Sequence, residues 1–187
     1  AALEDPNGDG DQSDSVAKET LVVFQSDNGG PKGSSREQLD ANGGLLGSKG
    51  SIFEGGIRVP TIMRWPAKIT AKSKLKVGTN TDMVMDCSDL LPTFCELAGA
   101  PVPLGLSGVS LAPTLTGEGG QRVREFLVHE AGGQASIIRG GYKLIRSRAN
   151  AKAGGKNKKR PKKPGVAKNL GKVQLYDLQA DPAEKNN

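Results

Sequence analysis

The sequence has 187 residues, of which 35% are hydrophobic and 4% aromatic, with 26 glycines and 11 prolines. This length suits one domain with a core, and the composition is typical of a loop-rich globular protein rather than of a disordered chain or a coiled coil. No stretch approaches the roughly 18 apolar residues that a membrane span needs. The net charge of +6 is uneven, because eleven Lys and Arg and no Asp or Glu lie from Arg146 to Lys172. The rest of the chain is net negative.

The first half of the chain begins with a short run that predicts a strand. Residues 21–25 (LVVFQ) are apolar and rich in β-branched side chains, which is typical of a buried parallel strand. Residues 26–30 (SDNGG) follow as a turn-forming cluster. A strand that ends in a polar, glycine-rich loop is where open α/β sheets bind their ligands. A second buried strand is predicted within residues 57–65, after Pro60.

A helical segment follows these strands. Residues 84–97 carry apolar side chains close to helical spacing. Pro92 lies inside this range, so it either kinks one helix or occupies the first turn of a second, with Asp89 as a candidate cap. Cys87 and Cys95 would be about 12 Å apart along such a helix, which is too far for a disulfide. We therefore predict two buried free thiols.

The second half of the chain predicts a small antiparallel sheet. A strand is expected at residues 126–128 and a hairpin at residues 136–139 and 142–146, because Gly140-Gly141 between them favours a tight turn. A last short strand is expected at residues 175–178. The chain is therefore α/β in its first half and antiparallel β in its second.

Three positions carry candidate chemistry. Asp27 and Asn28 offer the oxygen ligands that hard cations such as Ca²⁺ prefer, although Asp-Asn-Gly is also an ordinary turn sequence. Lys49 has glycines close on both sides, so its ammonium and bare backbone donors can approach an anion. Glu54 and Arg58 fit a structural salt bridge better than a catalytic pair.

Two strings make a resemblance specific. SDNGG, and then GSKGSIFEGGIRVPTIMRWP about twenty residues later, closely resemble the C-terminal signature of formylglycine-dependent sulfatases in the alkaline-phosphatase-like superfamily. The likeness continues through DLLPTFCELAGAPVP, SGVSLAPTLTG, IIRGGYKLI and LYDLQADPAEKNN. It implies the C-terminal part of an α/β sulfatase sandwich, ending in a small antiparallel sheet with a packing helix. The implied division is a polar loop at 1–19, the α/β part at 20–118 and an antiparallel subdomain at 119–187.

The resemblance also implies roles for individual residues. Asp27 and Asn28 match the acid and amide that complete a Ca²⁺ site, and Lys49 matches the catalytic lysine that contacts the sulfate. Glu54 and Arg58, with the two glycines between them, match the part of the motif that holds its shape.

The nucleophile is not in this chain, because neither cysteine has the Cys/Ser-x-Pro-x-Arg context whose first residue becomes formylglycine. The upstream aspartates that supply the other metal ligands are absent too. We therefore expect the chain alone to be inactive. Its lone histidine, His129, is interpreted as a packing or surface residue.

Other functions and partners stay open. The same scaffold serves phosphate and phosphonate monoester hydrolases, and a non-catalytic polyanion-binding protein is a further alternative. The basic insertion at 149–172 is interpreted as a solvated loop or as a tether for a sulfated polysaccharide. Nucleic acid ranks lower, because no aromatic residue interleaves the run to stack on bases. We expect the chain to need its missing N-terminal part, or an oligomer, to cover an apolar sheet edge. The resemblance suggests a periplasmic, secreted or lysosomal location.

Overall fold

The computed structural model describes residues 2–33, 39–71, 73, 75–148 and 171–187. Their contacts form two compact units, each built from two stretches of sequence. Unit 1 comprises Ala1–Phe24 and Thr61–Arg124, and unit 2 comprises Gln25–Pro60 and Glu125–Asn187. The division into three consecutive parts stays a prediction. The basic insertion, apart from its last two residues, lies outside the described residues.

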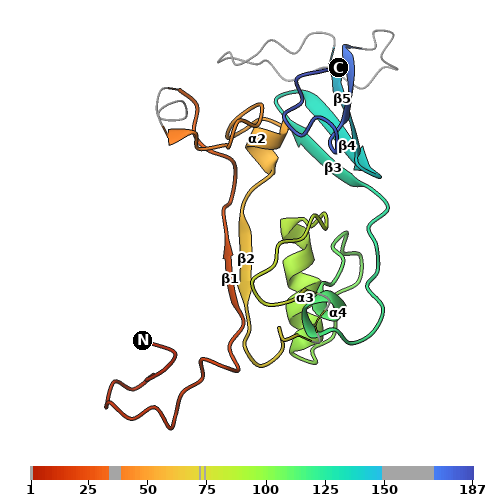
Figure 1. Ribbon diagram of the computed structural model, residues 1–187. Coiled ribbons are helices and arrows are strands. Elements are labelled where there is room, and N and C mark those ends of the chain that lie inside the picture. The colour runs from red at the N-terminus through yellow and green to blue at the C-terminus, as the bar shows by residue number, and fades with distance from the viewer. Residues whose placement is uncertain (1, 34–38, 72, 74, 149–170) are drawn as a thin grey trace, which may run out of the picture. The chain divides into compact units, whose positions relative to one another are not determined.

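Unit 1 contains a two-stranded sheet of β1 (Val22–Gln25) and β2 (Thr61–Arg64), which confirms both predicted strands. Figure 1 shows the chain passing along β1 and returning in the opposite direction along β2. The backbone N–H of Ser26, just after β1, donates to the carbonyl of Pro60, just before β2, at 3.2 Å. The prediction of a parallel strand is therefore wrong, because the intervening loop brings the chain back beside the end of β1.

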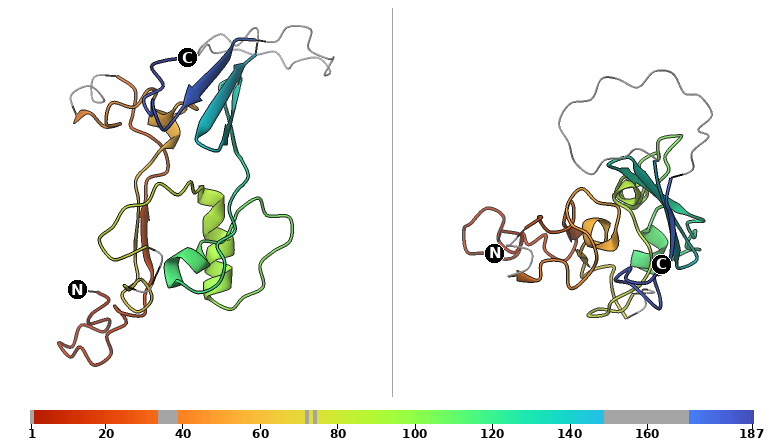
Figure 2. Two further views of the ribbon diagram at one scale, coloured as in Figure 1. Left: turned by 45° about the vertical axis from the view of Figure 1, so that its right-hand side comes forward. Right: turned by 90° about the horizontal axis from the view of Figure 1, so that it is seen from above.

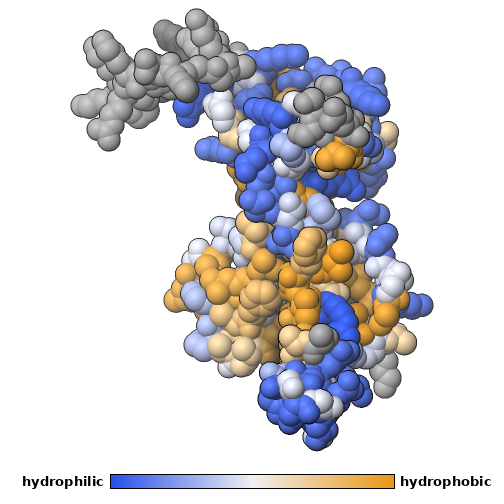
Figure 3. Space-filling view, turned by 90° about the vertical axis from the view of Figure 1, so that its left-hand side faces the viewer, coloured by the Kyte–Doolittle hydropathy of each residue, from blue (hydrophilic) through white to orange (hydrophobic). Residues whose placement is uncertain are grey.

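The two strands are not buried within this chain. Phe24 is 63% exposed and Ile62 is 61% exposed, and Val22 also faces solvent. Figure 3 shows apolar side chains gathered broadly over this part of the surface. The prediction of buried strands is thus wrong for the chain by itself, since alternate side chains of both strands contact water. The need for a covering partner stays a prediction.

The predicted helical segment is a 3₁₀ turn, η1 (Cys87–Asp89), followed by the helix α3 (Leu90–Leu97). Pro92 lies in the first turn of α3, so the second of the two alternatives holds. Asp89 occupies the N-cap position of α3, as predicted, but its side chain makes no cap hydrogen bond to that helix. It accepts from the backbone N–H of Asp86 at 2.8 Å and so completes a capping box at η1, in which Asp86 accepts from Ser88 at 2.9 Å. Gly99, with φ 64°, follows the helix as expected.

Asp89 also joins α3 to the segment before α4 (Ala112–Thr116). Its buried carboxylate accepts from the backbone N–H of Val109 at 2.7 Å and forms an ion pair with Arg124. The cysteine prediction is wrong in part: both thiols are free, but Cys87 is exposed and Cys95 is half-buried. Cys87 reaches solvent because it opens the 3₁₀ turn instead of facing the helix packing.

Unit 2 contains an antiparallel sheet in the order β3-β4-β5-β6, whose strands lie side by side in Figures 1 and 2. Gly140 and Gly141, with φ of 57° and 87°, make the tight turn that the Gly-Gly pair predicts. The predicted antiparallel sheet is therefore confirmed. The strand bounds are Leu127–Ala131 for β3, Gln134–Arg139 for β4, Tyr142–Ser147 for β5 and Val173–Asp177 for β6.

The core of unit 2 joins this sheet to the loop that follows β1. Ile52 packs with Ile145 of β5 and Tyr176 of β6, and all three are buried. The ring of Phe53 meets Tyr176 edge-on, with centroids 6.5 Å apart. The single-turn helix α2 (Glu54–Ile57) begins directly after these residues. The helix beside the sheet is thus α2, whose residues come before the strands of the sheet in the sequence. Among the described helices, none is long and apolar enough to cross a membrane.

Candidate functional site

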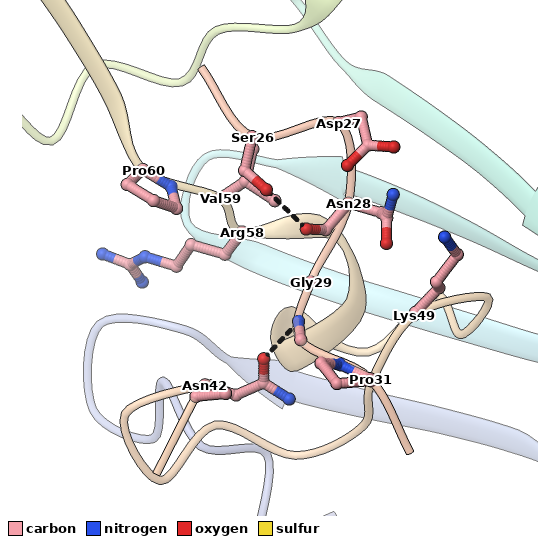
Figure 4. Close-up of a pocket in the computed structure, with 12 residues that line it drawn as sticks. Ser26, Asp27, Asn28, Gly29, Pro31, Asn42, Lys49, Arg58, Val59 and Pro60 are labelled. Atoms are coloured by element: carbon pink, nitrogen blue, oxygen red, sulfur yellow. Dashed lines mark hydrogen bonds between the residues drawn. The ribbon is translucent and has the colours of Figure 1, made fainter. Parts of the chain in front are cut away.

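The loop after β1 is held by one hydrogen bond within its own turn and by further hydrogen bonds to neighbouring segments. Ser26 donates through its hydroxyl to the carbonyl of Asn28 at 2.8 Å. The next N–H, on Gly29, donates to the carbonyl of Gly56 at 3.0 Å. Gly30 donates to the side-chain oxygen of Asn42 at 2.6 Å, as Figure 4 shows. The residues before and after Asp27 and Asn28 are therefore both held by hydrogen bonds, which fixes the backbone of these two residues.

Lys49 approaches the same loop from the second motif. Its backbone N–H donates to the carbonyl of Gly30 at 2.8 Å. Gly47 and Gly50 flank it with φ of 92° and 81°. Residues that carry a side chain rarely adopt this left-handed backbone conformation, so both positions favour glycine. Asn42 also contributes here, since its amide donates to the carbonyl of Gly47 at 3.0 Å. These bonds place Lys49 beside the Asp27 loop.

The three predicted site residues line one pocket of about 530 Å³. Figure 4 shows the side chains of Asp27, Asn28 and Lys49 on one side of the loop, whereas Arg58 extends to the other. Asp27 and Lys49 are exposed and Asn28 is half-buried. His129 lies half-buried on β3 and does not line this pocket. The remaining lining residues are Ser26, Gly29, Gly30, Pro31, Ala41, Asn42, Val59 and Pro60.

The donor set at this pocket fits part of a Ca²⁺ site. The carboxylate of Asp27 and the amide oxygen of Asn28 are hard ligands of the kind that Ca²⁺ takes, but Ca²⁺ needs about six to eight oxygens. Within the described residues, no group of three or more His, Cys, Asp or Glu side chains could hold a metal ion. These two residues would therefore serve as a fraction of the ligands.

Sequence reasoning missed Asn42 and a buried cluster of charges. Asn42 gave no signal, because a lone Asn in a glycine-rich loop is typical of a turn. The cluster consists of Glu54, Lys143 and Glu184, which are 5%, 0% and 2% exposed. The Lys143 ammonium lies 2.9 Å from a carboxylate oxygen of each glutamate. One signal could have found it: the alternation of residues along β5 puts Lys143 on the same, buried face as Ile145, and a buried lysine needs a charged partner.

The predicted pair of Glu54 and Arg58 is present but weak. Their closest atoms are 3.9 Å apart, and the Arg58 side chain is half-exposed. The main partner of Glu54 is Lys143, which was not predicted. Glu184 adds a further contact, because its carboxylate accepts from the backbone N–H of Glu54 at 2.6 Å and so satisfies a donor at the start of α2. Glu54 therefore makes structural contacts, as predicted, but its main partners are Lys143 and Glu184 rather than Arg58.

Burial raises the pKa of Glu184 above its ordinary value, while the Glu54 N–H and the Lys143 ammonium partly oppose this. The charge of Glu54 raises it further, and Tyr176 is the other titratable neighbour, its own pKa raised by burial and by Glu184. A carboxyl with a raised folded-state pKa contributes stability that is full below its unfolded pKa, about 4.3, and lost as pH rises through the folded value.

We accordingly expect the stability of wild-type unit 2, relative to Glu184→Gln, to fall as pH rises above about 4.3. Urea midpoints measured from pH 4 to 8 for both proteins give this difference. The lowered pKa of Asp181 acts in the opposite direction, but it is common to both proteins and cancels. A difference that stays constant with pH would contradict the assignment.

Comparisons with known proteins identify the family of the chain. The profile of the family described as N-sulphoglucosamine sulphohydrolase, C-terminal, matches residues 46–187. The chain belongs to the sulfatase family. It corresponds to a C-terminal portion of such a protein, as the two strings in its sequence predict.

Similar proteins are several times longer than this sulfatase chain. It is 41% identical over 121 residues to a sulfatase of Formosa agariphila, covering 63% of this chain and 20% of that protein. It is 36% identical over 130 residues to human steryl-sulfatase, covering 66% and 21%. The chain thus spans about a fifth of the length of these relatives.

Solved structures support the fold of the sulfatase chain. A sulfatase connected with the metabolism of multiple glycosaminoglycans by Bacteroides thetaiotaomicron superposes with a TM-score of 0.63 at 26% identity, covering 92% of this chain and 35% of that one. A 2-O glycosaminoglycan sulfatase superposes with a TM-score of 0.60 at 25% identity, covering 91% and 32%. The predicted fold class, an alkaline-phosphatase-like sulfatase portion, is confirmed.

Proposed function

We propose that the complete protein hydrolyses sulfate esters and that this chain supplies part of its metal and sulfate site. One observation carries the proposal: Asp27, Asn28 and Lys49 line one pocket in a chain of the sulfatase family. These residues come from two separate loops, and nothing in their sequence spacing requires that they meet. Their meeting is expected if a metal-bound sulfate group occupies the pocket.

Lys49 would bind and stabilise the anion. Its exposed ammonium stands on the same side of the loop as Asn28, so it can reach a sulfate oxygen or the ester oxygen on which negative charge develops. A positioned cation at a developing charge is usually the largest single contribution to catalysis. Asp27 and Asn28 would hold Ca²⁺, whose charge would draw electrons from the sulfate oxygens when bound. The nucleophile, a formylglycine, would come from outside this chain.

Two alternatives make different demands on the same pocket. A phosphate or phosphonate monoester hydrolase would use the same cation and lysine on another tetrahedral anion. A non-catalytic polyanion-binding protein would need the basic insertion rather than the pocket. Family membership favours sulfate over both. Because two similar structures concern glycosaminoglycans, sulfated polysaccharide is the substrate class that we propose for the complete protein.

The deciding experiment is aryl-sulfate turnover with Ca²⁺, using this chain alone and this chain extended through the upstream part that its relatives possess. We expect turnover only from the extended protein. Asp27→Ala should lower it by about 100-fold or more at low Ca²⁺, because a metal ligand is lost, and added Ca²⁺ should restore part of it. Asp82→Ala, which removes an exposed carboxylate of unit 1, is the control.

Each other outcome points to an alternative. Turnover by the chain alone would show that the nucleophile lies within it. Faster turnover of an aryl phosphate than of the sulfate would move the phosphoester hydrolase ahead. Binding of a sulfated polysaccharide without turnover of either ester would favour the polyanion-binding protein.

A further inference from the structure

The buried cluster of Glu54, Lys143 and Glu184 joins three segments that are far apart in sequence. Glu54 begins α2, directly after the loop that carries Lys49, whereas Lys143 lies on β5 and Glu184 close to the end of the sequence. Lys143 contacts both carboxylates at 2.9 Å, and Glu184 also accepts from the backbone of Glu54 at 2.6 Å. All of these contacts lie within unit 2. The cluster therefore anchors the first residue of α2 to the sheet.

The two glycines after Glu54 transmit this anchoring to the site. The N–H of Gly55 donates to the carbonyl of Leu46 at 2.7 Å, just before the Lys49 turn. The carbonyl of Gly56 accepts from Gly29, which directly follows Asn28. A side chain at Gly55 would lie 2.7 to 2.8 Å from three backbone carbonyl oxygens, too close to be accommodated without a shift. The backbone of α2 is thus packed directly against both site loops.

The segment that carries Glu184 is itself built to present this carboxylate. Asp177 ends β6 and accepts from the backbone N–H of Gln179 at 2.9 Å, and Asp181 accepts from that of Asn186 at 2.7 Å. Glu184 has a φ of 55°, a left-handed conformation that is unusual for a residue other than glycine. Such a conformation persists where surrounding contacts determine it. Here those contacts are the ones that Glu184 makes with Glu54 and Lys143.

We propose that Glu54, Lys143 and Glu184 are positioning residues, through which the segment 177–187 holds the Lys49 and Asp27 loops in the shape that binds sulfate. This deepens the proposed function and rests on it. Glu184 acts through the α2 backbone, because its carboxylate accepts from an N–H that would otherwise lack a partner at the start of that helix. The Glu-Gly-Gly string then has a physical reason. The charge of Glu54 anchors α2 to the sheet, and Gly55 and Gly56 allow the backbone of α2 to contact the Lys49 and Asp27 loops closely.

The test is hydrogen exchange followed by mass spectrometry on the full chain at pH 7. In Glu184→Ala, amides of residues 45–58 should lose about ten-fold or more of their protection, while those of β4 stay within about two-fold. Glu184→Gln keeps an oxygen acceptor for the Glu54 N–H, so it should retain most of the protection. Glu125→Gln is the matched control, because it removes one partner of an exposed ion pair in the same unit, with both side chains 70% exposed.

A second measurement is the affinity of the extended protein, with its upstream part, for inorganic sulfate in the presence of Ca²⁺. We expect it to fall about ten-fold in Glu184→Ala and to recover in Glu184→Gln. Uniformly faster exchange across unit 2 in Glu184→Ala would show a merely structural role and overturn the proposal, as would a loop that stays protected. If residues 45–58 loosen selectively but the extended wild-type protein binds no sulfate, the positioning contact stands and the proposed function fails.

Discussion

Lys143→Met is expected to lower the free energy of unfolding of unit 2 by about 3–5 kcal/mol, the cost of leaving buried charges without their partner. Lys143 is fully buried, and its ammonium is the cation that lies 2.9 Å from both Glu54 and Glu184. Methionine fills a similar volume, so the loss is of charge rather than of packing. The two tyrosines, Tyr142 and Tyr176, both lie in unit 2 and Trp65 lies in unit 1. Fluorotyrosine resonances and tryptophan fluorescence during urea unfolding therefore follow the units separately.

The companion variant removes all three charges. Lys143→Met combined with Glu54→Gln and Glu184→Gln should recover much of the lost stability, because neutral replacement of a buried ion cluster is often close to neutral. The Trp65 transition should be unchanged in both proteins. If Lys143→Met costs less than about 1 kcal/mol, or if the triple variant is the less stable of the two, the cluster does not act by charge neutralisation.

The sequence predicted the elements of this chain well where local chemistry determines them. Gly140-Gly141 specified the hairpin turn, and Gly99 marked the end of α3, because both positions need a positive φ that glycine supplies. Pro92 left a kink or a first turn as alternatives, and its fixed φ and missing N–H suit the first turn that the structure shows. These residues can be interpreted without knowing which other parts of the chain pack against them.

The errors arose where distant residues decide. The apolar run at residues 21–25 predicted a buried parallel strand, but direction depends on the return of the chain along β2 and burial depends on what covers the strand. Asp89 was predicted as a cap and does take part in the capping box of η1, but its ion pair with Arg124, 35 residues away, was not predicted. Glu54 was paired with Arg58, four residues away, because its contact with Lys143, 89 residues away, leaves no trace in the local pattern.

The candidate site divides in the same way. Resemblance placed Asp27, Asn28 and Lys49, and the structure gathers them on one pocket, although their roles stay predictions. Asn42 was missed, yet it holds both loops by accepting from Gly30 and donating to Gly47. The motif strings pointed to Asp27, Asn28 and Lys49, whereas the role of Asn42 depends on how the two loops pack against each other.

Lys49→Ala is expected to lower the kcat of the extended protein for an aryl sulfate by about 10²–10³, the usual loss when one stabilising group at a developing charge is removed. Lys49 is exposed and its side chain has no partner in the hydrophobic core, so the substitution should leave the urea midpoint unchanged. Its backbone contact with Gly30 does not depend on the side chain. The loss should therefore be chemical rather than structural.

Lys32→Ala is the control for Lys49→Ala, because Lys32 is also exposed and close in sequence to the loop but does not line the pocket. The two variants remove the same charge, so a general loss of attraction for the anion would affect both alike. A fall in kcat confined to Lys49→Ala would support charge stabilisation in the transition state. A rise in KM alone would instead make Lys49 a substrate-binding residue. Equal kcat and equal KM in both variants and the wild type would remove Lys49 from the site.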